Sequence, residues 1–66
     1  MKIVLNGEPY EYKGNGSLED LLSDAGVKPE RVATMVNGSV VKRDARDSVQ
    51  LHDGDAVELL TLVGGG

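Results

Sequence analysis

The 66-residue chain has no cysteine, tryptophan or phenylalanine, and it has a single histidine. Without cysteine it can form no disulfide, thiolate zinc site or cysteine nucleophile. Its only aromatic side chains, Tyr10 and Tyr12, are too few for a platform on which nucleic-acid bases stack. A chain of this length also buries only a thin core, with about 60% of its unfolded surface hidden on folding. These absences argue against an enzyme with a buried active site of its own.

Positive charge and long apolar runs are also scarce. Seven Lys and Arg stand against eleven Asp and Glu, for a net charge of −4. An acidic chain repels phosphate backbones, which argues against nucleic acid as a main partner. Every apolar run falls far short of the roughly 20 residues that cross a membrane, and no apolar signal-peptide core is visible at the N-terminus. We therefore expect one cytoplasmic domain that binds neither nucleic acid nor membrane.

Two Asn-Gly pairs are the clearest turn signals, because this dipeptide suits the type I′ turn of a β-hairpin. Asn6-Gly7 separates the apolar stretch 3–5 from the stretch 8–12, in which Tyr10 and Tyr12 share one face of a strand, and Asn37-Gly38 separates the β-branched stretch 32–36 from Val40 and Val41. A charged segment, 42–47, has no alternating pattern and is expected to form a loop or a single helical turn. The expected strands are 1–6, 8–12, 32–36, 40–41, a short strand at 49–52 and a last strand at 56–62.

One amphipathic helix is expected between the two hairpins. Ser17 can accept a hydrogen bond from the first free N–H groups, and Gly26 suits the position that ends a helix. Asp20 stands where a capping box has Glu or Gln, so that signal is partial. The apolar stripe has helical spacing and comprises Leu18, Leu21, Leu22 and Ala25.

The order of elements predicts an α+β fold in which one helix packs across one face of a mixed sheet of four to five strands. This is the β-grasp, or ubiquitin-like, arrangement, with the first and last strands adjacent and parallel at the centre. A plain antiparallel sheet with a helix at one end fits the same pattern and stays open. The domain is expected to span 1–63, followed by a flexible glycine tail at 64–66.

No group of side chains indicates catalysis or metal binding. His52 is expected at the solvent-facing end of a strand, and the serines have no second base to activate them. Asp53 and Asp55 bracket Gly54, but a calcium loop needs further oxygen ligands at set positions. A tight turn capped by the two Asp side chains is the favoured interpretation.

The last strand is apolar on both faces near its end. Val57 and Leu59 have one parity, whereas Leu60 and Leu62 have the other. Because one helix covers only one face, we expect Leu60 and Leu62 to form part of an exposed patch where a partner docks. The alternative is a β-bulge that returns one leucine to the core.

The chain then ends as Val63-Gly64-Gly65-Gly66. An extended glycine tail is thin and can thread a narrow channel, so it can deliver its terminal carboxylate into another protein. That carboxylate becomes an acyl donor once it forms a mixed anhydride with AMP. The plain alternative is a frayed end or a linker scar.

Several stretches, taken in order, carry a family resemblance: 3–8 (IVLNGE), the Ser17-led helix with Leu21-Leu22, 36–43 (VNGSVVKR), 53–58 (DGDAVE) and 63–66 (VGGG). Together they resemble the ThiS family, the sulfur carriers of the thiamine pathway, over essentially the whole chain. One departure is Lys42, where many members have proline; it lies in a loop and leaves the tail unaffected.

The resemblance implies a protein co-substrate that is not itself an enzyme and binds no cofactor. A ThiF-like adenylyltransferase would use ATP and Mg²⁺ to adenylate the Gly66 carboxylate. Sulfur supplied through a cysteine desulfurase would then replace AMP, and the thiocarboxylate would donate sulfur to a ThiG-like thiazole synthase. Gly64 and Gly65 would thread the partners' active sites, with Leu60, Leu62 and Val63 as the docking stem. The carrier alone is expected to be a monomer.

Three other functions fit the same features. The small subunit of molybdopterin synthase shares the fold, the diglycine end and the thiocarboxylate chemistry, although those chains are usually longer and richer in Phe. A ubiquitin-like modifier would instead be joined through Gly66 to lysines of target proteins. A β-grasp binding module would have an inert tail.

Overall fold

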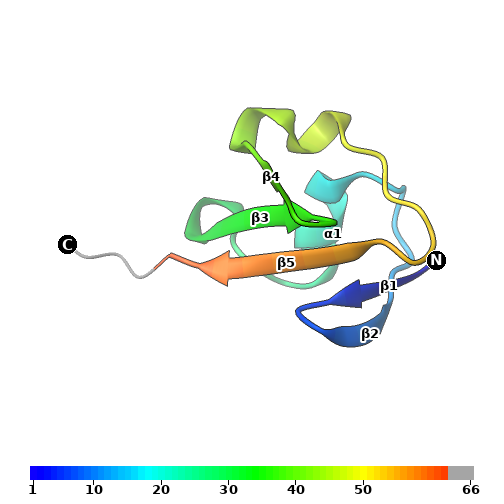
Figure 1. The fold of residues 1–66 in the computed structure, drawn as a ribbon. Coiled ribbons are helices and arrows are strands. Elements are labelled where there is room, and N and C mark those ends of the chain that lie inside the picture. Colours follow the sequence, from blue (N-terminus) through cyan, green and yellow to red (C-terminus); the bar gives the residue numbers. More distant parts are fainter. Residues whose placement is uncertain (63–66) are drawn as a thin grey trace.

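The structure, a computed structural model, describes residues 1–62. The strands are β1 (Lys2–Leu5), β2 (Glu8–Glu11), β3 (Val32–Val36), β4 (Ser39–Val41) and β5 (Ala56–Thr61), and the helix is α1 (Leu18–Asp24). Two short 3-10 helices are η1 (Pro29–Arg31) and η2 (Arg43–Ser48). The strands form one sheet in the order β2-β1-β5-β3-β4, with α1 packed on one face (Figure 1).

The centre of the sheet settles the topology. β1 and β5 run parallel, with Val4 opposite Ala56 and Leu5 opposite Val57, while every other neighbouring pair is antiparallel. This confirms the mixed β-grasp sheet and excludes a purely antiparallel one. β5 is therefore the central strand, held on one side by the first hairpin and on the other by the second.

Both Asn-Gly turns form as expected, and their asparagines also bind β5. Asn6 and Asn37 each have φ near 50°, in the left-handed region that Asn tolerates better than most residues. The Oδ1 of Asn6 accepts a hydrogen bond from the Leu59 N–H at 2.8 Å. The Oδ1 of Asn37 accepts one from the Ala56 N–H at 2.9 Å. Each hairpin is thus attached to the central strand through its turn.

The helix begins and ends where its caps predict. The Ser17 Oγ accepts a hydrogen bond from the Asp20 N–H at 3.1 Å, and Gly26 follows the helix with φ of 75°. The partial capping box has a structural reason: the Asp20 carboxylate accepts hydrogen bonds from the Tyr12 hydroxyl at 2.7 Å and the Asn15 N–H at 3.1 Å. Asp20 therefore fastens the loop before the helix.

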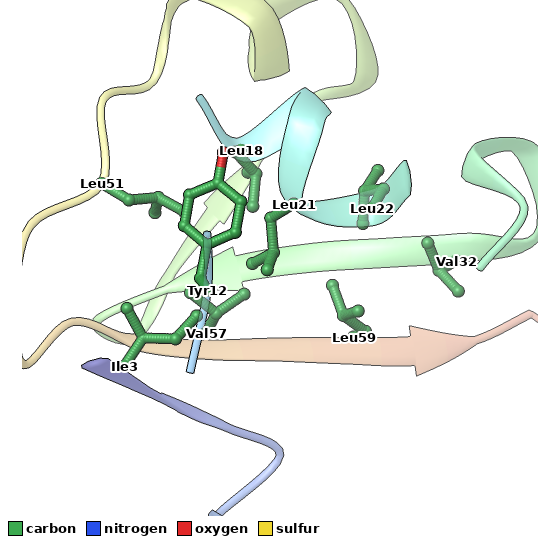
Figure 2. Close-up of a cluster of buried hydrophobic side chains, with 9 residues drawn as sticks. All are labelled: Ile3, Tyr12, Leu18, Leu21, Leu22, Val32, Leu51, Val57 and Leu59. Carbon is green, nitrogen blue, oxygen red and sulfur yellow. The ribbon is translucent and has the colours of Figure 1, made fainter. Parts of the chain in front are cut away.

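The core lies between α1 and the inner face of the sheet (Figure 2). Helix leucines face side chains of β1, β3 and β5, and Leu51 closes one end. The buried hydrophobic residues are Ile3, Tyr12, Leu18, Leu21, Leu22, Val32, Leu51, Val57 and Leu59.

Two segments after β4 differ in how well they were predicted. The charged stretch at 42–47 was expected to form a loop or a single helical turn, and most of it lies in the short helix η2. The prediction of a strand at 49–52 was wrong, because only an isolated β-bridge forms there, between Ser17 and Gln50. The segment pairs with the start of the helix: the Leu18 N–H donates to the Val49 carbonyl, and the Leu51 N–H to the Gly16 carbonyl. The alternation of apolar and polar residues at 49–52 reflects the burial of Leu51 against the loop before α1.

Candidate functional site

The end of β5 presents two leucines to solvent. Val57 and Leu59 point into the core, whereas Leu60 is 50% exposed and Leu62 is 53% exposed. The register with β3 is continuous from Val57 to Thr61, so the strand has no bulge in this pairing. The alternative of a leucine returned to the core was therefore wrong, and the exposure of Leu60 and Leu62 is confirmed.

Neighbouring strands extend this apolar surface. Met35 lies directly opposite both Glu58 on β5 and Val40 on β4, so these side chains share the face that α1 leaves uncovered. Val40 is 71% exposed. We call this surface the outer patch, made of Met35, Val40, Leu60 and Leu62.

Two cations lie at the end of the sheet where β5 finishes. The Leu62 N–H donates to the Arg31 carbonyl at 2.7 Å, which places Arg31 beside Leu62. Lys42 follows β4 in an extended conformation, two residues after Val40 and thus on the same face. Both are exposed, and neither forms an ion pair with any residue in 1–62. The outer patch of this acidic chain thus has two cations at the end of the sheet where β5 finishes, while Glu58 is an acidic residue farther along the same face.

The position of β5 explains why this end of the sheet is the candidate site. Figure 1 shows the C-terminal end of β5 on the opposite side of the domain from residue 1. The chain continues from there into the predicted docking residue Val63 and the tail residues Gly64, Gly65 and Gly66. All four lie outside the described residues, so their roles stay predictions.

The Asp53–Asp55 turn uses its carboxylates to hold backbone. The Asp53 Oδ1 accepts from the Lys2 N–H at 2.9 Å, and the Asp55 Oδ2 accepts from the His52 N–H at 2.8 Å. His52 has a 77% exposed side chain, with its Nδ1 3.9 Å from the Asp55 Oδ2. Within 1–62 no cluster of His, Asp and Glu is arranged to hold a metal, and no ligand pocket is found.

Another group of polar contacts fastens the loop before α1. The Tyr12 hydroxyl donates to Asp20 and accepts a hydrogen bond from the Gly16 N–H at 2.7 Å. Burial, followed by the hydrogen bond to the Asp20 carboxylate, raises the pKa of Tyr12 above its ordinary value. These groups lie around the core, away from the outer patch, and have a structural role.

Among residues 1–62, Arg46 is the one charged residue that is buried, and sequence reasoning missed it. It lies in η2 and is only 3% exposed. The neighbouring residues are polar and show no hydrophobic periodicity, so the sequence predicts a solvent-exposed segment. Only the tertiary structure shows that its guanidinium turns inward.

Comparison with known proteins places the chain in a family. The profile of the ThiS family matches residues 3–66. The chain belongs to the ThiS family. The sulfur carrier protein ThiS of Thermus thermophilus is 36% identical over 64 residues, which cover 97% of this chain and 98% of that protein. A crystal structure of the thiamine biosynthesis protein ThiS from Geobacter metallireducens superimposes with a TM-score of 0.85 at 39% identity, with both chains fully covered.

The ThiS-family match extends to longer proteins. A thiazole synthase of Magnetococcus marinus is 42% identical over 66 residues, which cover all of this chain and 20% of that protein. The chain thus spans about a fifth of that relative's length. Among residues 1–62, no helix has the length and apolar character needed to cross a membrane.

Proposed function

We propose that the chain carries sulfur for thiamine biosynthesis on its C-terminal Gly66. A carboxylate oxygen of Gly66 attacks the α-phosphorus of ATP in a ThiF-like adenylyltransferase, releasing pyrophosphate and leaving an acyl-adenylate. A persulfide sulfur, derived from cysteine through a desulfurase, then attacks the acyl carbon and displaces AMP. Reductive cleavage of the resulting acyl disulfide by a thiol leaves the thiocarboxylate. The ATP and Mg²⁺ belong to the activating enzyme, and the carrier acts as its co-substrate in the cytoplasm.

The observation that supports this proposal is the position of the outer patch beside the end of β5. A partner that binds Leu60 and Leu62 is next to the point from which Val63 and the glycine tail continue. Leu60 and Leu62 are half exposed, and apolar side chains that gather into a contiguous exposed patch often mark a binding surface. Gly64 and Gly65 lack side chains and therefore suit a narrow channel leading to the partner's reactive groups.

The receiving partner is proposed from the longer relatives. In the Magnetococcus marinus thiazole synthase, a stretch similar to this chain belongs to the same polypeptide as the synthase. A second thiazole synthase, from Paramagnetospirillum magneticum, is 35% identical over 66 residues and is likewise covered to 20%. Proteins joined in one chain in some organisms often act together in others, so a ThiG-like thiazole synthase is the favoured acceptor. The relatives' names favour the thiamine pathway over molybdopterin synthesis.

Reconstitution tests the proposal. The chain is incubated with a ThiF-like enzyme, ATP, Mg²⁺, a persulfide donor and a reducing thiol, and its intact mass is measured. We expect the mass to rise by the difference between sulfur and oxygen, with no change when ATP is omitted. A variant lacking Gly65 and Gly66 is the control and should stay unmodified. An unchanged mass of the full chain with an activator that modifies its own carrier would refute the proposal. Lysine-linked conjugates in extract would favour a protein modifier instead.

A further inference from the structure

Arg46 stands out because its charge is buried while no carboxylate within residues 1–62 forms an ion pair with it. Its side chain is 3% exposed, and no ion pair involves it among the residues of the described part of the chain. Burying a charge is costly unless hydrogen bonds replace its water, and a hydrophobic residue at such a position often serves stability equally well. The contacts of the guanidinium therefore indicate what the residue does.

The guanidinium joins η2 to the segment that leads into β3. Its Nη1 donates to the Pro29 carbonyl at 2.9 Å and its Nη2 to the Val32 carbonyl at 2.7 Å. Its Nε donates to the Thr34 Oγ1 at 3.3 Å, and that hydroxyl donates to the Val41 carbonyl at 2.9 Å. A planar fork of donors can hold three acceptors at fixed positions, which a lysine ammonium on a flexible stem cannot do equally well.

The same segment holds the end of β5. Arg31 lies between the two carbonyls that Arg46 binds, and its own carbonyl accepts the Leu62 N–H at 2.7 Å. Val32 is also the residue paired with Thr61. A shift of residues 29–32 would therefore move the backbone against which the last residues of β5 are aligned.

We propose that Arg46 is a positioning residue for the site: it fixes residues 29–32 and, through them, the orientation of Leu62 where the chain leaves the sheet. It acts through the backbone of Arg31 and touches no reacting atom. The part of this proposal that concerns partner enzymes rests on the proposed sulfur-carrier function. The part that concerns the end of β5 does not.

Hydrogen exchange tests the structural part. Arg46→Met keeps the length of the side chain but removes its donors, and Arg43→Met is the matched control, because Arg43 is an exposed cation of the same 3-10 helix. The Leu62 amide reports on the end of β5. The Asn6 amide, which donates to the Val57 carbonyl at 2.9 Å, reports on its other half.

We expect Arg46→Met to speed exchange at Leu62 by about fivefold relative to Asn6, the change expected for loss of one typical hydrogen bond. Arg43→Met should change neither amide. Equal acceleration at both amides would show a purely global contribution to stability and overturn the proposal, as would an unchanged rate at Leu62. If Arg46→Met does not fold, Arg46→Lys, which keeps a cation but loses the fork, is judged by the same ratio, with a smaller increase expected.

Kinetics with the activating enzyme test the functional part. Arg46→Lys, assayed at a temperature where it is fully folded, should raise the KM of the carrier about fivefold and leave kcat within about twofold, because a misplaced docking residue weakens binding before chemistry. Arg43→Met should match the wild type. An unchanged KM for folded Arg46→Lys would overturn this part. Failure of the wild-type chain to become thiocarboxylated would instead refute the proposed function and leave the exchange result standing.

Discussion

Leu59 and Leu60 are neighbours on β5 that point to opposite faces, so replacing each with Ala separates stability from docking. Leu59 is 8% exposed and packs in the core, where Leu→Ala changes cost about 2–5 kcal/mol. Leu60 is 50% exposed. Full burial of a leucine side chain is worth about 1.5–3 kcal/mol, so removing part of a half-exposed one should cost about 1 kcal/mol or less.

The scale of total stability makes the difference measurable. A chain of 66 residues is expected to have an unfolding free energy of about 3–10 kcal/mol. Leu59→Ala should therefore remove a large share of that stability, whereas Leu60→Ala should leave most of it. Urea unfolding followed by circular dichroism gives both free energies, and an unchanged m-value shows that the unfolding transitions are comparable.

Docking should follow the opposite order. Leu60→Ala should raise the KM of the carrier for the activating enzyme about fivefold or more, the effect of losing an apolar contact worth about 1 kcal/mol or more. Leu59→Ala, assayed where it is folded, should keep a KM close to that of the wild type. An equal loss of stability in both variants would mean that Leu60 belongs to the core. A stable Leu60→Ala with unchanged KM would refute its role in docking.

Three further changes test other contacts. Asn6→Ala leaves the Leu59 N–H without its side-chain acceptor and should lower the unfolding free energy, measured in urea, by about 1–3 kcal/mol. Asn6→Asp keeps an acceptor oxygen and should lower the unfolding free energy much less. Equal decreases in unfolding free energy for the two variants would refute the contact. Because the pKa of Tyr12 is raised on folding, the protonated hydroxyl contributes its full stabilisation below pH 10, and this stabilisation is lost as the pH rises through the pKa of Tyr12 in the folded protein. The difference in unfolding free energy between wild type and Tyr12→Phe should therefore narrow above pH 10. A difference that stays constant with pH in urea titrations would contradict this. Replacing both Arg31 and Lys42 with Glu should slow association with the activating enzyme by about tenfold at low salt, and the difference from the wild-type rate should shrink as the salt concentration rises. A decrease in association rate that does not depend on salt in stopped-flow measurements would argue against charge steering.

Most of the fold could be predicted because the decisive signals are local. Asn6-Gly7 and Asn37-Gly38 specify hairpin turns, and Ser17 with its leucine stripe specifies the helix. With these elements in place, only a few arrangements bury one apolar face. The exposure of Leu60 could also be predicted, since a single helix cannot cover both faces of the central strand.

The parts that could not be predicted depend on contacts between distant residues. The alternation at 49–52 resembles a strand, yet its backbone pairs with the loop before α1, and no local signal separates these outcomes. Arg46 lies in a charged stretch that predicts solvent exposure. Its burial depends on hydrogen bonds to the carbonyls of Pro29 and Val32. These carbonyls are distant from Arg46 in the sequence and come near its guanidinium only in the folded chain.

We propose that sulfur is carried on the carboxyl group of Gly66. The most direct measurement is fragment-level mass spectrometry of the chain purified from cells that also express a ThiF-like enzyme and a cysteine desulfurase. We expect one oxygen to be replaced by sulfur in the fragment containing Gly66, and this sulfur to be lost after incubation with thiazole synthase and the other thiazole precursors. A sulfur-free C-terminal fragment from cells whose activating enzyme is shown to be active would contradict sulfur carriage on Gly66.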